Sequence, residues 1–440
     1  MATMLLFGVL SALPGLASSL DIFVAPPAAA SSTATAPAAA ADGSRELPFS
    51  TVFAARDAMR SGLGQGQPRT VHVSGDHLLA QPFVLDERDS ASFSAPVVYK
   101  SADTTVPARL SGGKKIPVSA FVAATVPSGA AGVLKAELFS TENGLNASNI
   151  PGLTSPYPFG DLELYYEGKP QTRSRSPNIA PTDGTWMWSG YENVTNISAG
   201  DMGFEFLDTE KAEMWAPAAA AGKLWLHGFF KFDWRDTFIK IDSIKPSGKG
   251  YLVTRDAKTP PCYGFVTGCR FYAVGALELL DVPGEYHVDK DTGTLHFLPP
   301  TPLGADSDVL VSVLATVLEA NNVNHTSWKD MTISVARGKV VQVTGGHNVQ
   351  VSNCTVTNAG STCLSMDAGT NHTAHGNTVR PIVLSTPCDK VIMSFLMRLS
   401  LTDCLVGFRV RWRWYINQLG RHQHAGTRQQ CCHGQYDHQL

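Results

Sequence analysis

The sequence lacks the short motifs that mark several common enzyme classes. It contains no Gly-x-Ser-x-Gly elbow, no P-loop, no dinucleotide fingerprint and no His-Glu-x-x-His pattern. Each of these motifs uses its spacing to position a nucleophile, a phosphate group or a metal ion. The sequence therefore does not favour an α/β-hydrolase, a nucleotide-binding enzyme or a zinc protease, and no cofactor or metal is expected.

Charged residues are also scarce. They make up 17% of the 440 residues, and 35 Lys and Arg nearly balance 38 Asp and Glu, for a net charge of −3. A chain without a basic excess has no general attraction for nucleic acid, so no nucleic-acid partner is expected. Hydrophobic residues make up 43%, which is enough for a large core, and the 39 Gly and 27 Pro are typical of short strands joined by many turns.

The N-terminal apolar run is too short to span a bilayer, so no membrane span is expected. It covers residues 4–17 and ends in Ala17-Ser18-Ser19, where small residues suit cleavage before Leu20. We predict a signal peptide over residues 1–19 and a secreted, extracellular protein. The alternative is a buried N-terminal strand or helix, because no Lys or Arg precedes the apolar run.

The glycosylation sequons and the cysteines are consistent with a secreted protein. Six Asn-x-Ser/Thr sequons are candidate glycosylation sites. They begin at Asn146, Asn193, Asn196, Asn324, Asn353 and Asn371. Cys262 and Cys269 flank a loop rich in Pro and Gly, which a disulfide between them would close in an oxidising compartment. Cys354 and Cys363 fit small buried thiols equally well.

Two segments with different residue patterns precede residue 309. Residues 20–115 have short strands separated by turns, with one amphipathic helix over about 52–60 that Ser50 or Thr51 can cap. Residues 116–308 alternate aromatic and aliphatic residues with polar ones, which predicts a β-rich antiparallel insertion with a hairpin over 285–298. Four tryptophans of this insertion are candidates either for stacking on sugar rings or for the core: Trp186, Trp188, Trp225 and Trp234.

Residues 309–380 contain a 23-residue repeat. Thr332, Thr355 and Thr378 follow one another at this spacing, and a β-branched residue comes after each. Residues 341–343 and 326–328 recur at the same spacing. A period in the twenties with very short alternating strands predicts a solenoid whose successive turns are joined by parallel hydrogen bonding.

The predicted fold is all-β. Because parallel crossovers are almost always right-handed, we expect a right-handed parallel β-helix with coils at 20–115 and 309–380. The alternative is a β-sandwich with evenly spaced strands. The two folds differ in one observable: only a β-helix places Thr332, Thr355 and Thr378 directly over one another.

Several segments occur in a distinctive order. They cover residues 109–116, 164–170, 175–178 and 276–289. With them, residues 21–380 resemble a family of secreted right-handed parallel β-helix proteins, relatives of pectate lyases and of β-helical glycoside hydrolases. The resemblance implies a polysaccharide or glycan partner and, often, cleavage of a glycosidic bond by groups on the outer face of the later coils.

Few carboxylates are available in the coils for such chemistry. A glycosidase needs two at short range, and a lyase of this fold needs a cation held by acids, which makes a lyase the less expected enzyme here. Asp367 directly follows residues 364–366 of the repeat, where a carboxylate can face solvent. Asp330 takes a similar place in an earlier turn. For both, the alternative to catalysis is a turn-forming Asp.

Residues 381–440 break the pattern of the repeat. They carry seven Lys and Arg against three acids, and four of the eight cysteines. We expect an atypical tail, disordered or wrongly predicted from the gene, in place of the catalytic coils. The functional hypothesis is thus a glycoside hydrolase-like protein truncated before its catalytic coils. The alternative is a non-catalytic extracellular protein that binds carbohydrate or has a structural role.

Overall fold

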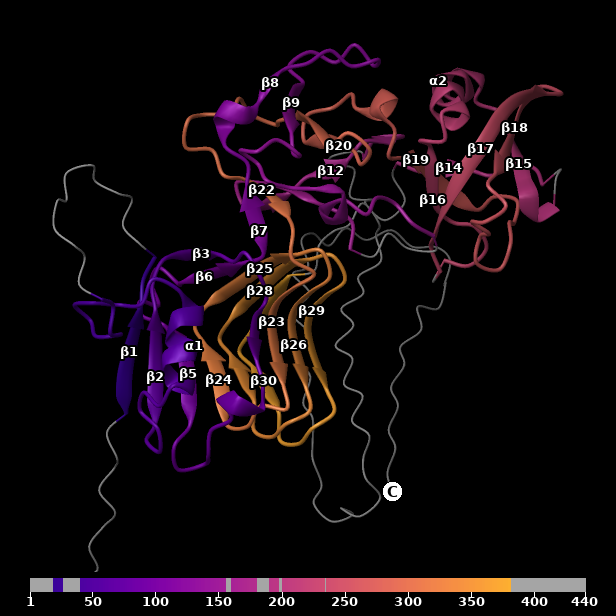
Figure 1. Cartoon of the computed structure of the whole chain (residues 1–440). Helices are drawn as coiled ribbons and strands as arrows, with labels where there is room; N and C mark the ends of the chain where they lie inside the picture. The colour runs from indigo at the N-terminus through magenta and orange to yellow at the C-terminus, as the bar shows by residue number, and fades with distance from the viewer. Residues whose placement is uncertain are drawn as a thin grey trace, which may run out of the picture. The chain divides into compact units, whose positions relative to one another are not determined.

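The computed structural model describes residues 19–26, 40–155, 160–179, 190–197, 200–233 and 235–380 (Figure 1). The predicted signal peptide, apart from its last residue, and the predicted tail lie outside these residues. In this part of the chain, strands predominate and only two α-helices occur. Neither helix is long and apolar enough to cross a membrane.

Three parallel sheets, together called the strand stack, form the first part of the fold. Sheet A contains β1 (Leu20–Val24), β2 (Arg69–Val73), β5 (Val97–Ser101), β24 (Thr326–Lys329), β27 (Gln350–Ser352) and β30 (Thr373–His375). Sheet B contains β3 (Asp76–Leu78), β6 (Arg109–Ser111), β25 (Thr332–Ala336), β28 (Thr355–Ala359) and β31 (Thr378–Arg380). Sheet C contains β4 (Phe83–Leu85), β23 (Thr316–Asn321), β26 (Lys339–Thr344) and β29 (Thr362–Asp367).

The predicted 23-residue register is confirmed. Thr332 pairs with Thr355, which pairs with Thr378, all in parallel strands of sheet B. The second and third repeated segments behave alike, because Val341 pairs with Leu364 in sheet C and Trp328 pairs with Val351 in sheet A. Each turn of the chain therefore adds one strand to each sheet, as a solenoid requires.

The strand stack is continuous although the chain leaves it between β6 and β23. Strand β24 pairs directly with β5, β25 with β6, and β23 with β4. In Figure 1 the orange β24 consequently lies beside the indigo β5. The first coils and the repeat thus share one hydrophobic core, which residues far apart in the sequence build together.

Left-handed backbone conformations recur at the corners of the strand stack. The corner residues Asp330, Asn353 and Gly376 have φ values of 58°, 53° and 66° and are spaced by the length of the repeat. Asn and Asp adopt this conformation more readily than most residues, because their side chains bond locally. Three further sets keep the same spacing: Asn322, Gly345 and Ala368; His325, Asn348 and Asn371; Val335 and Asn358.

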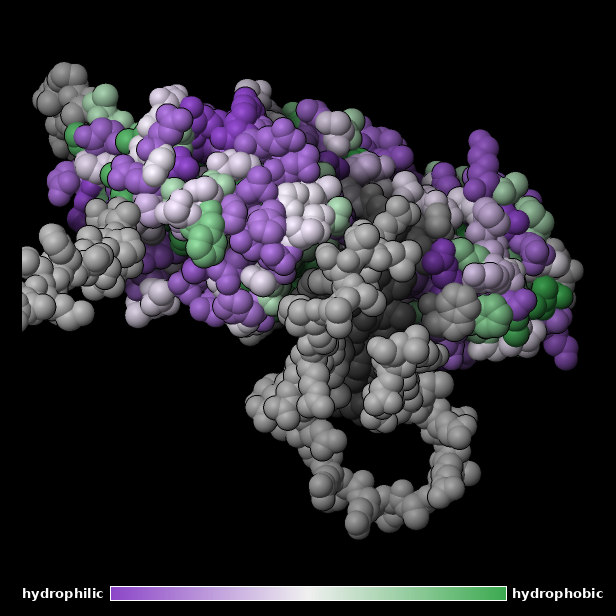
Figure 2. Space-filling model, turned by 90° about the horizontal axis from the view of Figure 1, so that it is seen from below, coloured by the Kyte–Doolittle hydropathy of each residue, from purple (hydrophilic) through white to green (hydrophobic). Residues whose placement is uncertain are grey.

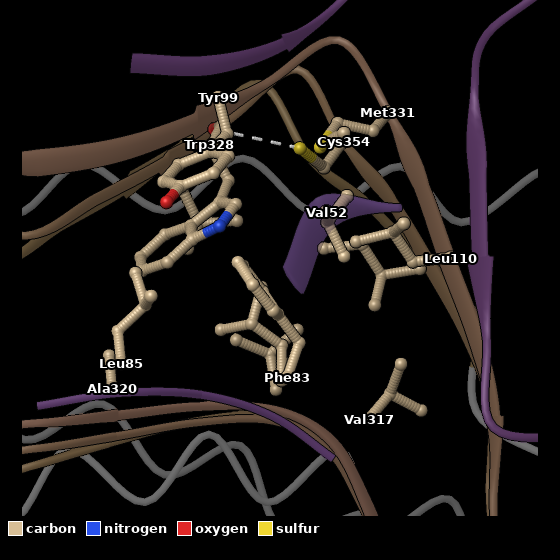
Figure 3. Packing of buried hydrophobic residues seen from close by; sticks show 14 of the residues in the cluster. Val52, Phe83, Leu85, Tyr99, Leu110, Val317, Ala320, Trp328, Met331 and Cys354 are labelled. Carbon is tan, nitrogen blue, oxygen red and sulfur yellow. Dashed lines mark hydrogen bonds between the residues drawn. The ribbon is translucent and has the colours of Figure 1, made fainter. Parts of the chain in front are cut away.

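Aromatic rings fill the core where the two parts of the strand stack meet (Figure 3). The Trp328 ring stacks on that of Tyr99, with centroids 6.1 Å apart and planes 11° apart. Tyr99 in turn meets Phe83 edge to face at 5.5 Å. The Cys354 thiol, drawn beside Trp328, lies 3.6 Å from the Trp328 carbonyl oxygen. The stacking of Tyr99 on Trp328 joins β5 to β24, two strands on opposite sides of the segment between β6 and β23.

Helix α1 (Val52–Arg60) also packs on this core. Thr51, one of the two predicted caps, accepts a hydrogen bond from the Ala54 N–H. The helix buries Val52, Ala55 and Met59 at the spacing of one helical face. Its last residue, Arg60, donates to Asp89 in the turn η1 (Glu87–Asp89).

Residues 113–312 form sheets whose strands are mainly antiparallel, as predicted for the insertion. The expected hairpin is present, with β20 (Glu285–Asp289) antiparallel to β21 (Thr294–Leu298). The other strands are β7 (Gly113–Lys115), β8 (Val122–Ala123), β9 (Leu134–Glu137), β10 (Leu164–Tyr166), β11 (Lys169–Pro170), β12 (Thr172–Arg173), β13 (Arg175–Ser176), β14 (Glu192–Asn193), β15 (Gly203–Phe206), β16 (Trp225–Phe229), β17 (Thr237–Ser247), β18 (Gly250–Arg255), β19 (Arg270–Val274) and β22 (Val309–Ser312). The helix α2 (Thr209–Ala220) was not expected from the sequence, and the remaining turns are η2 (Val118–Ala120), η3 (Ala147–Asn149), η4 (Gly200–Met202) and η5 (Leu277–Leu279).

Removing the Trp328 side chain is expected to destabilise the whole strand stack. The residue is fully buried, so Trp328→Ala should lower the free energy of unfolding by about 3–5 kcal/mol through lost contacts and a cavity. Urea unfolding followed by circular dichroism measures the change. The exposed Lys245→Ala is the control and should change it by less than about 0.5 kcal/mol. A loss below about 1 kcal/mol for Trp328→Ala would contradict this role of the residue.

Candidate functional site

The outer face of sheet C carries a ladder of polar side chains. Along β23, β26 and β29 the residues that point into the core are apolar, and those between them are polar. We call the polar set the polar face: Glu319, Asn321, Lys339, Gln342, Thr344, Thr362, Asp367 and Ser365. All are partly exposed except Ser365, which is buried at 3% exposure. The register aligns Glu319 with Gln342 and Ser365 on one row, and Asn321 with Thr344 and Asp367 on the next.

Asp367, the predicted catalytic candidate, is the last residue of β29 and belongs to this polar face. Its carboxylate accepts a hydrogen bond from the Ser365 hydroxyl and lies 3.7 Å from the Lys339 ammonium group. The same ammonium group lies 3.4 Å from the Ser365 oxygen. The Asp367 and Lys339 side chains are about one third exposed, at 34% and 35%, so a ligand on this face can reach both groups.

The second carboxylate of the polar face is Glu319. It lies on β23, separated from β29 by β26 and offset from Asp367 by two residues along the strand. Two strand spacings and this offset place the two backbones about 12 Å apart. Glycosidases hold their two carboxyl groups about 5 to 9.5 Å apart. Side chains on backbones about 12 Å apart must extend toward each other across β26 to come within that range.

Asp330, the second catalytic candidate, lies at a corner instead of on the polar face. Its φ is 58°, and its side chain accepts a hydrogen bond of 3.2 Å from the Asn353 amide of the next turn. This contact corresponds to the turn-forming alternative, because it joins equivalent corners of neighbouring turns. The corner geometry could have been inferred from the sequence, since Asp330, Asn353 and Gly376 all suit left-handed backbone.

Of the four tryptophans proposed for sugar stacking, only Trp225 lies in the described residues. It is half-buried on β16 and packs against a small cluster that contains Phe238 and Tyr272. This position agrees with the core alternative more than with a free stacking platform. Trp186, Trp188 and Trp234 lie outside the described residues.

The predicted disulfide is not formed, since Cys262 and Cys269 are both free cysteines. The backbone N–H of Cys262 donates to Thr237, at the start of β17, whereas Cys269 directly precedes β19. Strand β16 lies between β17 and β19, which holds the two ends of the loop about two strand spacings apart. A disulfide requires a closer approach of the two backbones.

The sequons differ in what their amide groups do. Five of the six asparagines are exposed, and Asn324 is half-buried. The amide nitrogen of Asn353 is bonded to Asp330, and that of Asn196 donates to Glu205 at 3.2 Å. A glycan at either position must be accommodated beside this hydrogen bond. The side-chain amide nitrogens of Asn146, Asn193 and Asn371 have no such contact within the described residues, which leaves them the least restricted candidates.

Two of the distinctive sequence segments, 175–178 and 276–289, meet around a buried carboxyl group. Glu285 accepts hydrogen bonds from the backbone N–H groups of Arg175 at 3.3 Å and Asp281 at 3.2 Å. Asn178 donates to Asp281 at 2.9 Å. Burial raises the pKa of Glu285 to about 8, so the carboxyl group is protonated at neutral pH. No pattern in the sequence indicated this contact.

Other ionisable groups are buried among residues 113–312. Burial raises the pKa of Glu163 to about 7, although the Tyr165 hydroxyl donates to it at 2.6 Å. His227 lies 3.1 Å from Asp236, and its burial lowers its pKa, which keeps the imidazole neutral. Because His227 is fully buried, substrate cannot reach it in this conformation. These groups lie inside the sheets of residues 113–312 and are not candidates for substrate contact.

Surface properties add two constraints. In the view of Figure 2, hydrophilic residues cover most of the described surface and hydrophobic ones form small separate patches. This is typical of a face without a large apolar docking area. Within the described ranges, no group of three or more His, Cys, Asp or Glu side chains is arranged to hold a metal ion.

Comparisons with known proteins support the fold. No protein-family model and no curated protein matches the chain. A solved structure described as a glycoside hydrolase is similar, at 16% identity and a TM-score of 0.54, over 79% of this chain and 63% of the other. A complex of XylC with xylose is similar at 12% identity and a TM-score of 0.39, over 79% and 42%. The chain therefore shares its fold with a glycoside hydrolase and spans less than two thirds of that protein.

The raised pKa of Glu285 predicts a pH-dependent stability. In the unfolded chain the carboxyl group titrates near pH 4.5, whereas in the folded protein it holds its proton to about pH 8. The unfolded state therefore binds fewer protons between these values, and stability falls as the pH rises from about 4.5 to about 8. Glu285→Gln, which cannot titrate, should flatten this decline, as urea unfolding across that range would show. An exposed Glu210→Gln should leave the decline unchanged. An equally steep decline in Glu285→Gln would refute the assignment.

Proposed function

We propose that this protein is a secreted, carbohydrate-directed protein whose strand stack is a right-handed parallel β-helix, and that it binds glycan on the polar face of sheet C. The fold shared with a solved glycoside hydrolase supports the carbohydrate-related role. The handedness follows from the strong preference of parallel crossovers. Secretion rests on the N-terminal apolar run and the sequons.

The observation that supports this proposal most directly is the periodicity of the polar face. Carboxylate, amide and hydroxyl groups recur on equivalent positions of β23, β26 and β29, about 4.8 Å apart from strand to strand. Such groups are the donors and acceptors that recognise sugar hydroxyls. A surface that repeats by this step suits a ligand that also repeats, as a polysaccharide does.

Binding without efficient cleavage is the expected behaviour. A glycosidase needs one carboxyl as general acid and a second as base or nucleophile at short range. Glu319 and Asp367 are separated by a whole strand, and Asp367 is engaged by Ser365 and Lys339. Because Ser365 and Lys339 engage the Asp367 carboxylate, we propose that this pair binds glycan without hydrolysing it.

Neutralising the two carboxylates of the polar face is the direct test. Glu319→Gln with Asp367→Asn should weaken the binding of a neutral polysaccharide by about tenfold or more, because hydrogen bonds to charged groups are the stronger ones. Affinity electrophoresis against a panel of xylan, glucan and galactan measures the effect. Reducing-sugar release from the same panel should be close to background for the unaltered protein.

A matched control removes two exposed carboxylates elsewhere. Asp242→Asn with Asp306→Asn makes the same charge change within residues 113–312 and should leave binding unaltered. Equal binding by the polar-face variant and the unaltered protein would show that glycan does not bind there. Efficient sugar release that survives the polar-face substitutions would place a hydrolytic site elsewhere in the chain.

A further inference from the structure

A small pocket lies beside the first residues of the strands in sheet A. It has a volume of about 20 Å³ and is partly open. Its walls come from strands β2, β4, β5 and β24, from helix α1 and from the turn η1. Its polar lining residues are Arg60, Arg69, Arg88, Asp89, Tyr99 and Thr326, and we call it the arginine pocket.

Arg69 occupies a position on the inward side of its strand. It precedes the buried Val71 by two residues and pairs with the buried Val97 of β5, so the alternation along β2 directs it toward the core. Its aliphatic stem packs against the loop at Gly64, where a Cβ atom would come within 3.0 Å of the Arg69 Cδ. A charged side chain in this position needs a partner, because an unpaired buried charge is costly.

Two donors of the arginine pocket lack such a partner. Within the part of the chain that the structure describes, the Arg69 side chain forms no ion pair or hydrogen bond, and its buried Nε has no acceptor. The hydroxyl of Tyr99, a residue only 2% exposed, likewise has no hydrogen-bond partner among these residues. Burial raises the pKa of Tyr99, so its hydroxyl keeps the proton that it can donate.

The two carboxylates beside the pocket are already engaged by other arginines. Arg60 lies 2.5 Å from Asp89 and 3.2 Å from Asp86. Arg88 lies 2.6 Å from Asp86. Two arginines and two aspartates thus balance each other. Arg69 remains as a single positive charge in excess, since an arginine stays protonated at neutral pH.

We propose that the arginine pocket binds one small monovalent anion, such as chloride, between the Arg69 guanidinium and the Tyr99 hydroxyl. One excess positive charge calls for one negative charge, and both groups are donors that an anion accepts from. A single water molecule needs about 10–15 Å³ of room, so a pocket of about 20 Å³ suits a monatomic ion and is too small for sulfate or phosphate.

The position of the pocket gives the anion a structural effect. Arg69 lies on β2 and Tyr99 on β5, whereas Thr326 belongs to β24, on the other side of the segment between β6 and β23. The anion therefore contacts both parts of the strand stack at their junction. A ligand that binds only the folded state stabilises it by mass action, so the stability of the strand stack should depend on the halide concentration. This site is independent of the polar face and of any glycan.

The test compares chloride with an anion that is too large for the pocket. Replacing sodium methanesulfonate by sodium chloride at equal ionic strength leaves the screening of surface charges unchanged. The chloride should raise the melting temperature of the full chain by about 2 °C or more. Arg69→Gln should abolish this difference. Tyr99→Phe, which keeps the ring on Trp328, should weaken the apparent chloride affinity by about tenfold.

A matched variant removes an arginine outside the pocket. Arg45 is exposed, and Arg45→Gln should keep the full difference between the two salts. Crystals grown with sodium bromide provide the direct measurement, since the anomalous signal of bromide should mark the pocket within hydrogen-bond distance of Arg69 and Tyr99.

Each outcome decides the inference. Equal melting temperatures of the unaltered protein in the two salts would overturn it, as would a water molecule in place of bromide. An undiminished chloride effect in Arg69→Gln would assign the ion to another site. If Arg69→Gln does not fold, Tyr99→Phe and the bromide signal still decide. Glycan binding that fails on sheet C leaves these measurements unaffected.

Discussion

The structure depends on the in-register stacking of successive turns of the chain. No turn of this strand stack can bury its apolar residues alone, since each strand is only three to six residues long and has one inward face. The contact that matters most is the junction of β5 with β24, where Tyr99 and Trp328 stack across a boundary that separates early and late parts of the sequence. If that junction failed, the first coils and the repeat would be two small solenoids with exposed ends.

Stacking also determines what the outer surface can do. Because the register is constant, equivalent positions of every turn form straight rows perpendicular to the strands. The side chains on a row determine its chemistry, so sheet C presents carboxylates, amides and hydroxyls whereas sheet A presents lysine and histidine. One architecture thus yields two outer surfaces with different side chains.

Residues 113–312 follow a different principle. Their sheets enclose ionisable groups whose pKa values are displaced by burial, notably Glu285 and Glu163. Glu285 links the backbones of two segments far apart in the sequence through hydrogen bonds to Arg175 and Asp281. The strand stack is tied to this part by Arg337, which donates to the carbonyl oxygen of Gly160. Polar contacts of this kind specify a single packing arrangement, since a misplaced buried donor or acceptor is costly.

The sequence by itself determined the period of the strand stack. The alignment of Thr332, Thr355 and Thr378 is visible in the sequence, because every turn of a solenoid needs a similar residue at the equivalent position. The hairpin of β20 and β21 and helix α1 were predictable for the same reason, as short-range patterns. Only the tertiary structure decided that Cys262 and Cys269 stay apart and that Lys100 pairs with Lys329. These relations join residues through strand pairing across long stretches of chain, and such pairing is set by the packing of the whole core, which no local pattern encodes.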